Sequence, residues 1–466
     1  MITMSLAEVA TVTGGDVHDA DPATTISGAV SVDSRLVEPD GLFAAIRGER
    51  VDGHDFAEAA VRAGAGAVLA GRPVGVPAVV VADPVAALGR LARHVVDQLV
   101  DCCVIAITGS QGKTTTKDLL ASVLEQIGET VAPAGNFNNE IGVPLTALRA
   151  RHSTRYLVVE MGARGTGQIA YLCTVTPPDV AVVLNVGVAH IGAFGGRAQI
   201  AAAKSELVAA LPSSGLAVLN ADDPLVVAMA DRCAGRLLTF GAVEAADVRV
   251  SDVTLDGDGR AGFCLAAQGD RVPVRLQLVG EHQALNAAAA AAVSLGCGAD
   301  LARTAALLER ATARSPWRMD VRRRADGVTI VNDAYNANPT SMQAALRTLS
   351  AMGAAPASSG RTVAVLGEML ELGGTALDEH LALGRLVVEL GITELVAVGP
   401  GAAAVHGAAL QAGAGPAQLF WVPDVPAALA VLGDRLGRGD VVLVKASRGA
   451  GLERVAQGLL DADVDA

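Results

Sequence analysis

The chain has 466 residues and a formal net charge of −13 at pH 7. This length predicts about three domains of roughly 150 residues each, with enough chain for sizeable cores. The acidic balance argues against a nucleic-acid-binding protein that relies on overall positive charge, although a local basic site for phosphate groups is compatible with it.

The six cysteines form no C-x-x-C pair and no framework of the kind found in short secreted chains, so neither zinc nor disulfides are indicated. No apolar run approaches the ~20 residues of a membrane span, and the early acids Glu8 and Asp16 oppose a secretory signal. We therefore expect a protein of the reducing cytoplasm, with no nucleic-acid partner and no membrane span. We also expect a monomer, although these patterns do not encode the oligomeric state.

Residues 1–100 predict a small α/β domain. Short apolar strands are expected at 30–32, 41–46 and 78–81, and helices at 56–64 and 84–99. Two polar patches interrupt this pattern, one around Ser34 and Arg35 and the other around His54. Taken alone, both patches are typical of turns with helix-capping residues.

The second unit, residues 101–315, begins with an apolar β-branched run, a glycine-bearing turn and a helix that starts at a lysine. This order predicts a strand, a phosphate-binding loop and a helix N-terminus, where backbone N–H groups, a lysine and a hydroxyl meet a nucleoside triphosphate and Mg²⁺. The position five residues before the glycine–lysine pair is Ile107, so the motif is a compressed T-G-x-x-G-K-T-T. The expected nucleotide contacts are Gly109, Ser110, Gln111, Gly112, Lys113, Thr114 and Thr115.

Further strands at 156–160, 180–185, 216–220 and 237–240 alternate with helices and predict a parallel sheet, which binds ligands at the carboxyl ends of its strands. Glu160 ends one strand and His190 follows another. Both are candidate Mg²⁺ ligands, Glu160 the more typical one because magnesium prefers oxygen. Alternatively, Glu160 pairs with Arg164, and His190 merely caps a turn.

The third unit, residues 316–466, opens within the linker segment 315–319, where Pro316 is expected to end the preceding helix. Strands at 328–332, 362–366, 395–398 and 441–444 predict a second parallel α/β sheet of Rossmann type. Asn338 before Pro339 is by itself a good helix start. The expected fold class is therefore α/β with three domains: a small N-terminal one, a central phosphate-loop sheet and a C-terminal Rossmann-like one.

The compressed phosphate loop resembles the signature of the Mur ligase family, the ATP-dependent amide-forming enzymes of peptidoglycan synthesis. Other segments are similar to that family in the same order, and they cover all three units. These segments are D-S-R at 33–35, D-G-H-D-F at 52–56, G-N-F-N-N-E-I-G-V-P at 135–144, E-M-G-A at 160–163, 185–196, A-K-S-E at 203–206, G-E-H-Q-A-L-N at 280–286, D-A-Y-N-A-N-P-T-S-M at 333–342 and L-V-K-A-S-R at 443–448.

The resemblance implies an ATP- and Mg²⁺-dependent ligase that works through an acyl phosphate. The segment at 333–342 is similar to that of the members that attach D-alanyl-D-alanine to a UDP-N-acetylmuramoyl-tripeptide, which are the implied partners. Lys204 is implied to carry CO₂ as a carbamate and to serve as a metal ligand with Thr114, Glu160 and His190. The remaining implied contacts are Ser34 and Arg35 for the uridine end, Asn138, Asn139, Asn336 and Asn338 for substrate, and Asn286, Arg318 and Asp333 for nucleotide.

Without the resemblance, Lys204 would be a solvated helical lysine paired with Glu206, Asn286 an amide inside an alanine-rich helix, and Arg318 an exposed arginine. A folylpolyglutamate synthase or another amino-acid-adding member of the family would share the central unit. A phosphate-loop kinase, or a nucleotide-gated binding protein, would explain the loop alone. The third residue of the peptide, the kinetic order and any regulation are not encoded in these motifs.

Overall fold

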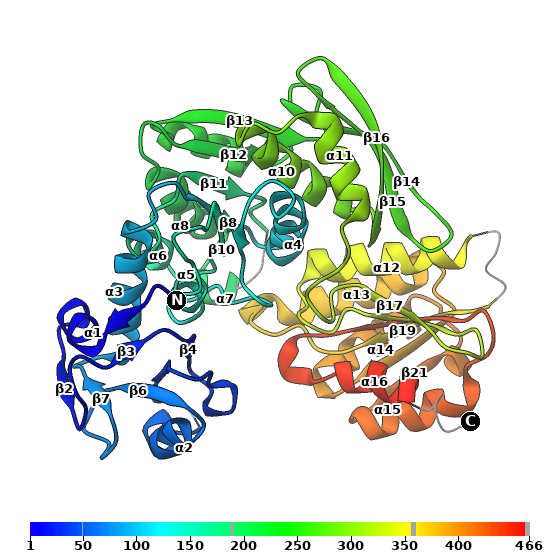
Figure 1. Ribbon diagram of the computed structural model, residues 1–466. Helices are drawn as coiled ribbons and strands as arrows, with labels where there is room; N and C mark the ends of the chain where they lie inside the picture. The colour runs from blue at the N-terminus through cyan, green and yellow to red at the C-terminus, as the bar shows by residue number, and fades with distance from the viewer. Residues whose placement is uncertain (49, 188–190, 356–359, 462–466) are drawn as a thin grey trace.

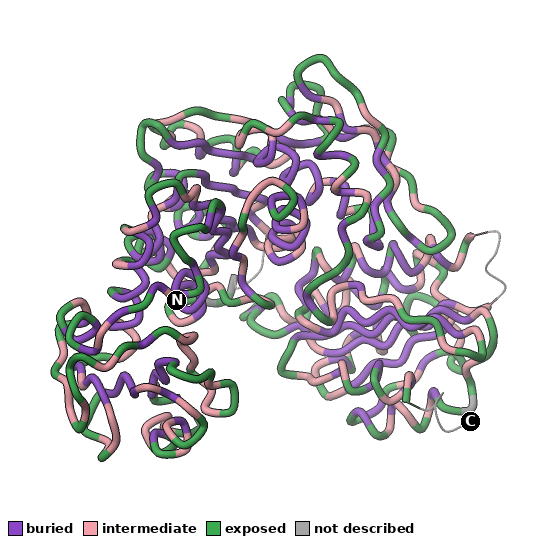
Figure 2. The backbone as a smooth tube through the Cα atoms, viewed as in Figure 1, coloured by how far each residue is buried: buried purple, intermediate pink, exposed green. Residues whose placement is uncertain are grey.

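The computed structural model describes residues 1–48, 50–187, 191–355 and 360–461, and in these residues it forms three main sheets with their own helices (Figure 1). The buried backbone runs through the middle of each sheet, and the exposed segments lie around it (Figure 2). The α/β class and the division into three α/β units are confirmed. No described helix combines the length and the apolar character that crossing a membrane requires.

The N-terminal unit has a five-stranded sheet in the order β2-β7-β6-β5-β4, in which only the β2–β7 pair is antiparallel. Asp83 accepts hydrogen bonds from the first turn of α3, and Pro84 begins that helix with its φ already suited to it. Helix α3 packs against α5 and α6 of the central unit and so joins the two units. The elements are β1 (Met4–Ser5), α1 (Leu6–Thr13), β2 (Asp16–His18), β3 (Thr25–Ile26), β4 (Val30–Ser31), η1 (Ser34–Leu36), β5 (Gly41–Ala44), η2 (Gly53–Phe56), α2 (Ala57–Arg62), β6 (Ala65–Ala70), β7 (Ala78–Val80) and α3 (Pro84–Asp97).

The central unit has a nine-stranded sheet in the order β16-β15-β14-β13-β12-β11-β8-β10-β9. Every neighbouring pair between β9 and β14 in this order is parallel. The pairs β14–β15 and β15–β16 are antiparallel, and these three strands form a ribbon that extends one edge. The strands are β8 (Cys103–Thr108), β9 (Thr130–Val131), β10 (Tyr156–Glu160), β11 (Val180–Val183), β12 (Leu216–Asn220), β13 (Arg236–Gly241), β14 (Val248–Leu255), β15 (Arg260–Ala267) and β16 (Asp270–Val279).

The helices of the central unit include α10, in which every side chain from Ala287 to Ala292 is fully buried. Methyl side chains let α10 approach α4 and the sheet closely, so the alanine run is a core element and not low-complexity sequence. The helices are α4 (Lys113–Leu124), α5 (Gly142–Ala147), α6 (Gln168–Val175), α7 (Ile191–Phe194), α8 (Arg197–Ala209), α9 (Pro224–Val227), η3 (Ala228–Arg232), α10 (Gln283–Gly296) and α11 (Leu301–Arg310).

The C-terminal unit has a six-stranded sheet in the order β17-β18-β22-β19-β20-β21, parallel except for the β17–β18 pair. Helix α11 ends at Arg310, so the expectation that Pro316 ends it was wrong: Ala311 already has extended backbone (ψ 134°). The elements are β17 (Asp320–Arg323), β18 (Thr329–Asn332), α12 (Pro339–Gly353), β19 (Thr362–Leu366), η4 (Gly373–Thr375), α13 (Ala376–Glu389), β20 (Glu394–Val398), η5 (Pro400–Ala402), α14 (Ala403–Gln411), η6 (Pro416–Gln418), β21 (Leu419–Val422), α15 (Val425–Leu432), η7 (Gly433–Arg435), β22 (Val441–Lys445), η8 (Arg448–Ala450) and α16 (Glu453–Asp461).

Candidate active site

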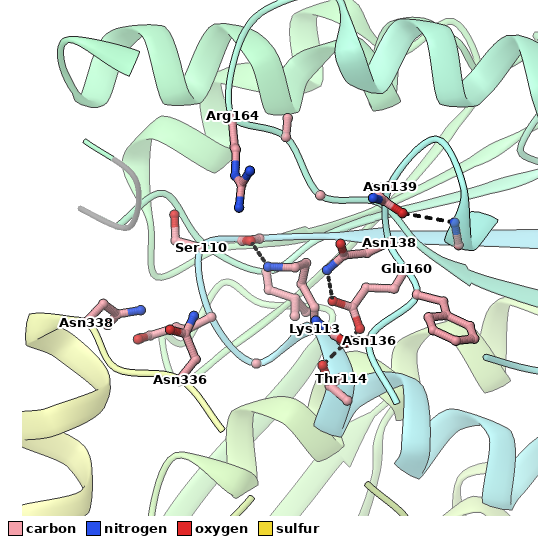
Figure 3. A pocket seen from close by; sticks show the side chains of 18 of the residues that line it. Ser110, Lys113, Thr114, Asn136, Asn138, Asn139, Glu160, Arg164, Asn336 and Asn338 are labelled. Carbon is pink, nitrogen blue, oxygen red and sulfur yellow. Dashed lines mark hydrogen bonds between the residues drawn. The ribbon is translucent and has the colours of Figure 1, made fainter. Parts of the chain in front are cut away.

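A cavity of about 1300 Å³ lies where the three units meet. Val32 and Asp83 of the N-terminal unit line one part of it, the loop after β8 lines the middle, and Asn336 and Arg448 of the C-terminal unit line another part. The central residues follow the carboxyl ends of β8, β10 and β11, which is where parallel sheets bind ligands. Figure 3 shows Asn336 and Asn338 on one side of the phosphate loop and Asn138 and Asn139 on the other.

The loop between β8 and α4 has the backbone of a phosphate cradle. Gly112 has a φ of 82°, and a Cβ there would lie 2.5 Å from Oδ1 of Asn286, so only glycine fits. Helix α4 begins directly after it with no side-chain cap, which leaves the positive end of the helix free for an anion. The side chain of Asn185 braces the loop, because its Oδ1 accepts the N–H groups of Ser110 (2.9 Å) and Gln111 (3.0 Å).

Lys113, Thr114 and Glu160 lie together at the centre of the cavity (Figure 3). Nζ of Lys113 donates to the carbonyl of Gly109 (2.8 Å), and burial lowers the pKa of this lysine. The buried carboxylate of Glu160 accepts hydrogen bonds from Oγ1 of Thr114 (2.9 Å) and Nδ2 of Asn138 (2.8 Å). Arg164 instead pairs with Glu371 (3.4 Å), so the alternative Glu160–Arg164 pair does not form.

Lys204 on α8 lines the same cavity with only 5% of its surface exposed. No hydrogen bond or ion pair joins its amine to another described residue. Burial, together with the nearby charge of Lys113, lowers the pKa of Lys204 to about 7. The alternative partner Glu206 is engaged elsewhere, since its carboxylate accepts the N–H groups of Gly167 (2.6 Å) and Ala170 (3.0 Å) at the start of α6. The solvated, paired lysine expected without the resemblance is therefore not what the structure contains.

Three other central residues of the sequence prediction have different surroundings. His190 lies outside the described residues. Oδ1 of Asn139 accepts the N–H of Gly142 (2.9 Å), the first residue of α5, and Asn139 also lines the cavity. Asn286 is buried against the phosphate loop, with Nδ2 donating to Oε1 of Gln283 (2.8 Å).

The C-terminal wall of the cavity is built around a buried ion pair. Nζ of Lys445 lies 2.6 Å from Oδ2 of Asp333 and donates to the carbonyl of Asn336 (2.9 Å). Burial lowers the pKa of Lys445, and Asp333 opposes this effect. Asn338 caps α12 by accepting the N–H of Ser341 (2.9 Å), as its position before a proline predicted, and it still lines the cavity.

Arg318 connects the C-terminal unit to the phosphate loop. Its guanidinium lies 4.1 Å from the ring centre of Tyr335, and one of its nitrogens donates to Oγ1 of Thr114 (3.3 Å). Nε of Arg318 is buried without a partner among the described residues, so the group has donor capacity left for an anion in the cavity. Arg318 is therefore not the exposed arginine of the alternative interpretation.

Ser34 and Arg35 do not join this group. They belong to η1 and are absent from the described lining of the cavity. The side chain of Arg35 is 86% exposed and pairs with Asp33 (2.6 Å), which holds the pKa of Asp33 at about 2.

The donor set fits a nucleoside triphosphate with Mg²⁺. An uncapped helix N-terminus, Lys113 and Arg318 supply positive charge for phosphates, and Thr114 with Glu160 supplies oxygen ligands. No cluster of three or more His, Cys, Asp or Glu side chains suited to a metal occurs in the described part of the chain. A Mg²⁺ site does not require such a cluster, because this ion is usually held by one or two carboxylates together with substrate phosphates and water.

Sequence reasoning assigned no role to Asn185 or to Tyr335. Asn185 lies two residues beyond the last residue of β11, so its place just after a strand end was a usable signal. Tyr335 lies within the segment 333–342, but its contact with Arg318 depends on the linker and has no signal in the local sequence.

Comparison with known proteins gives three matching family models: "Mur ligase family, catalytic domain" at residues 28–95, "Mur ligase middle domain" at 107–294 and "Mur ligase, glutamate ligase domain" at 317–448. The chain is 47% identical to the UDP-N-acetylmuramoyl-tripeptide--D-alanyl-D-alanine ligase of Mycobacterium bovis, over 99% of both chains. It superimposes on MurF from Acinetobacter baumannii with a TM-score of 0.86 and 33% identity, covering 98% of this chain and 99% of that one. For MurF ligase from Thermotoga maritima in complex with ADP, the TM-score is 0.79, the identity 31% and the coverage 94% and 99%.

Proposed function

The chain belongs to the Mur ligase family, and from this premise we propose that it is the ATP-dependent ligase that joins D-alanyl-D-alanine to a UDP-N-acetylmuramoyl-tripeptide in peptidoglycan precursor synthesis. The full-length similarity to ligases that carry this name supports the choice of member. The observation that carries the chemistry is one cavity with the uncapped phosphate loop at its centre and Asn336 and Asn338 on a facing wall.

The three units take three tasks in this proposal. Residues 1–100 hold the UDP end of the peptide substrate. Its uridine group extends beyond the cavity and contacts Ser34 and Arg35. Residues 101–315 bind ATP. Residues 316–466 bind D-alanyl-D-alanine, the substrate that supplies the amine, and contribute the cations Arg318 and Lys445. Val32 and Asp83 support this division, because they extend the cavity toward the N-terminal unit.

The reaction makes an amide from a carboxylate, which must first be activated. ATP transfers its γ-phosphoryl group to the terminal carboxylate of the tripeptide, and ADP leaves. The free amine of D-alanyl-D-alanine then attacks the acyl phosphate, loses a proton and displaces inorganic phosphate. Lys113 and Arg318 neutralise charge on the phosphoryl group and need no covalent step of their own.

Mg²⁺, when bound, shields the phosphate charges and orders their oxygens. Thr114 and Glu160 would hold it, with His190 as a further ligand. Asn138 keeps the Glu160 carboxylate oriented through its hydrogen bond of 2.8 Å. Asn286 packs behind the loop and contacts the nucleotide base, and Asp333 contacts the nucleotide from the C-terminal unit.

Lys204 acts as a carbamate in this proposal. Its amine is buried with no partner in the described part of the chain, and a pKa of about 7 leaves a large neutral fraction, which is the form that reacts with CO₂. An ammonium at this place would repel Mg²⁺, whereas a carbamate supplies oxygen ligands and a charge that Lys113 can balance. Lys204→Ala should therefore lose most activity and regain part of it with a small added carboxylic acid, while Lys204→Arg stays inactive. Full activity of Lys204→Arg would contradict the carbamate.

We further propose a monomer that works in the cytoplasm, where the UDP-linked precursor and ATP are both available.

The decisive experiment incubates the protein with ATP, Mg²⁺ and pairs of candidate substrates and measures phosphate together with amide product. Phosphate release should require both the UDP-linked tripeptide and D-alanyl-D-alanine, with one phosphate for each amide. Addition of a single amino acid to a UDP-linked dipeptide, or of glutamate to a folate, would assign the chain to another member of the family.

A further inference from the structure

Behind the phosphate loop, one helical turn beyond Lys113, helix α4 carries two adjacent buried charges. Lys117 is 2% exposed and Asp118 is 5% exposed, and neither lines the cavity. The ammonium of Lys117 has three partners: Oδ1 of Asp118 at 2.5 Å, the carbonyl of Pro133 at 2.9 Å and Oγ of Ser315 at 3.4 Å. All three of its N–H donors are thus directed, each to a different segment of the chain.

These two side chains fasten the start of the linker to the helix. Oδ2 of Asp118 accepts the backbone N–H of Ser315 (3.1 Å), and Lys117 donates to the hydroxyl of the same residue. Arg314, just before it, forms two hydrogen bonds of 2.6 and 2.7 Å with Glu125 at the end of α4. The linker therefore runs back along α4, from its last turn toward the phosphate loop.

Up to Ser315 the linker contacts α4 of the central unit, and beyond Ser315 it contacts the C-terminal unit. The carbonyl of Trp317 accepts the N–H of Tyr335 (3.3 Å), and Met319 donates its N–H to Oδ1 of Asp333 (3.2 Å). Trp317 and Met319 have φ values of 58° and 51°, a left-handed backbone that costs such side chains about 1–3 kcal/mol each and needs fixed surroundings. Arg318 lies between them and reaches back to Thr114.

We propose that Lys117 and Asp118 are positioning residues for the ligase reaction. They hold Ser315 against the phosphate-loop helix and thereby fix the point from which Arg318 enters the cavity. Lys117 also holds the loop at Pro133 through its hydrogen bond to that carbonyl. Five residues later in the same loop, Asn138 donates to the carboxylate of Glu160. Stability alone does not account for the pair, because apolar side chains of similar volume usually serve a core at least as well as a buried ion pair.

The kinetic test of this inference rests on the proposed function, because it measures ligase turnover. It is a double-mutant cycle between Asp118→Asn and Arg318→Ala. Asp118→Asn should lower kcat at saturating ATP by at least about tenfold, and by less than about twofold when Arg318 is already alanine, because coupled residues are not additive. Losses that multiply in the double variant would show that Asp118 acts independently of Arg318 and would overturn the proposal. Glu125→Gln, which weakens the more exposed linker contact, is the matched control and should change kcat less than about twofold.

A second readout needs no ligase activity. The chain has two tryptophans, so a Trp421→Phe parent leaves Trp317 as the only reporter, and it lies in the linker itself. Asp118→Asn should raise the acrylamide quenching of Trp317 about twofold by loosening the linker. If that variant does not fold, Lys117→Met combined with Asp118→Asn removes both buried charges and should show the same increase.

Unchanged quenching of Trp317 in the folded variant would refute the anchoring. A wild-type protein that makes no amide would instead refute the proposed function, while the quenching result would still decide whether Lys117 and Asp118 hold the linker.

Discussion

Replacing Lys204 by methionine should stabilise the substrate-free protein while it abolishes turnover. The amine is buried and has no hydrogen-bond or ion-pair partner among the residues that the structure describes, and its pKa falls from an ordinary value of 10.5 to about 7. Each tenfold change in proton affinity is worth about 1.4 kcal/mol, so the charged lysine costs the folded state about 5 kcal/mol near neutral pH. Methionine keeps most of the apolar stem and removes this cost.

The sign of the pH dependence follows from the lowered pKa. Between about pH 7 and 10.5 the unfolded chain binds a proton at Lys204 that the folded chain does not, so wild-type stability rises with pH through this window. The advantage of Lys204→Met should therefore be about 5 kcal/mol near pH 6.5 and only about 1 kcal/mol near pH 9.5.

Urea denaturation in CO₂-free buffer at these two pH values measures the effect as a shift of the midpoint at unchanged slope. Lys117→Met is the matched control, because it replaces a lysine of similar burial whose ammonium has three partners. That variant leaves Asp118 buried and unpaired and should lose about 3–5 kcal/mol, the opposite sign. Parallel pH profiles for wild type and Lys204→Met would refute the burial argument, and added bicarbonate should stabilise only the wild type.

The remaining predictions concern the cavity and the linker. Lys113→Ala should lower turnover by at least ~10²-fold, the scale of one charge-stabilising group, and near-normal phosphate release would remove the loop from the mechanism. Lys445→Met leaves Asp333 buried and unpaired, so thermal unfolding should show a loss of about 3–5 kcal/mol; an unchanged melting temperature would count against the buried pair. The C-terminal unit should move about the linker 315–318 during the reaction, so X-ray scattering should detect smaller dimensions with an ATP analogue and UDP-tripeptide, and unchanged dimensions would speak against closure.

The strands with continuous apolar runs could be predicted from the sequence, because both faces of a parallel sheet are covered. The ribbon β14–β16 was missed although its sequence alternates: in β15 every second side chain, from Ala261 to Ala267, is buried. A period of two residues is the pattern of a strand with one solvated face, so the signal was present. The boundaries of the short strands β2 and β17 had no comparable pattern.

The site shows where local sequence misleads. Arg164 and Glu206 are close in sequence to Glu160 and Lys204, and each was a reasonable partner by spacing. In the fold, Glu206 serves the start of α6, and Arg164 reaches Glu371 across the cavity. Lys117 was overlooked because a lysine on a helix is usually solvated, and its burial depends on a linker almost two hundred residues later. Such partners are determined by tertiary structure, so the residues nearby in sequence do not predict them.

The alanine run of α10 also limits the size of the side chains that this helix can hold. Its methyl groups determine how closely α10 can approach both α4 and the sheet, and the same helix carries Asn286 against Gly112. A larger side chain anywhere from Ala287 to Ala292 would push α10 away from its neighbours. Overpacking of this kind typically lowers the free energy of unfolding by about 1–3 kcal/mol. Because α10 and the phosphate loop are in direct contact, part of that displacement would reach Gly112. Random mutagenesis of this helix should accordingly yield variants that fold but bind nucleotide weakly, although residues 287–292 do not line the cavity themselves.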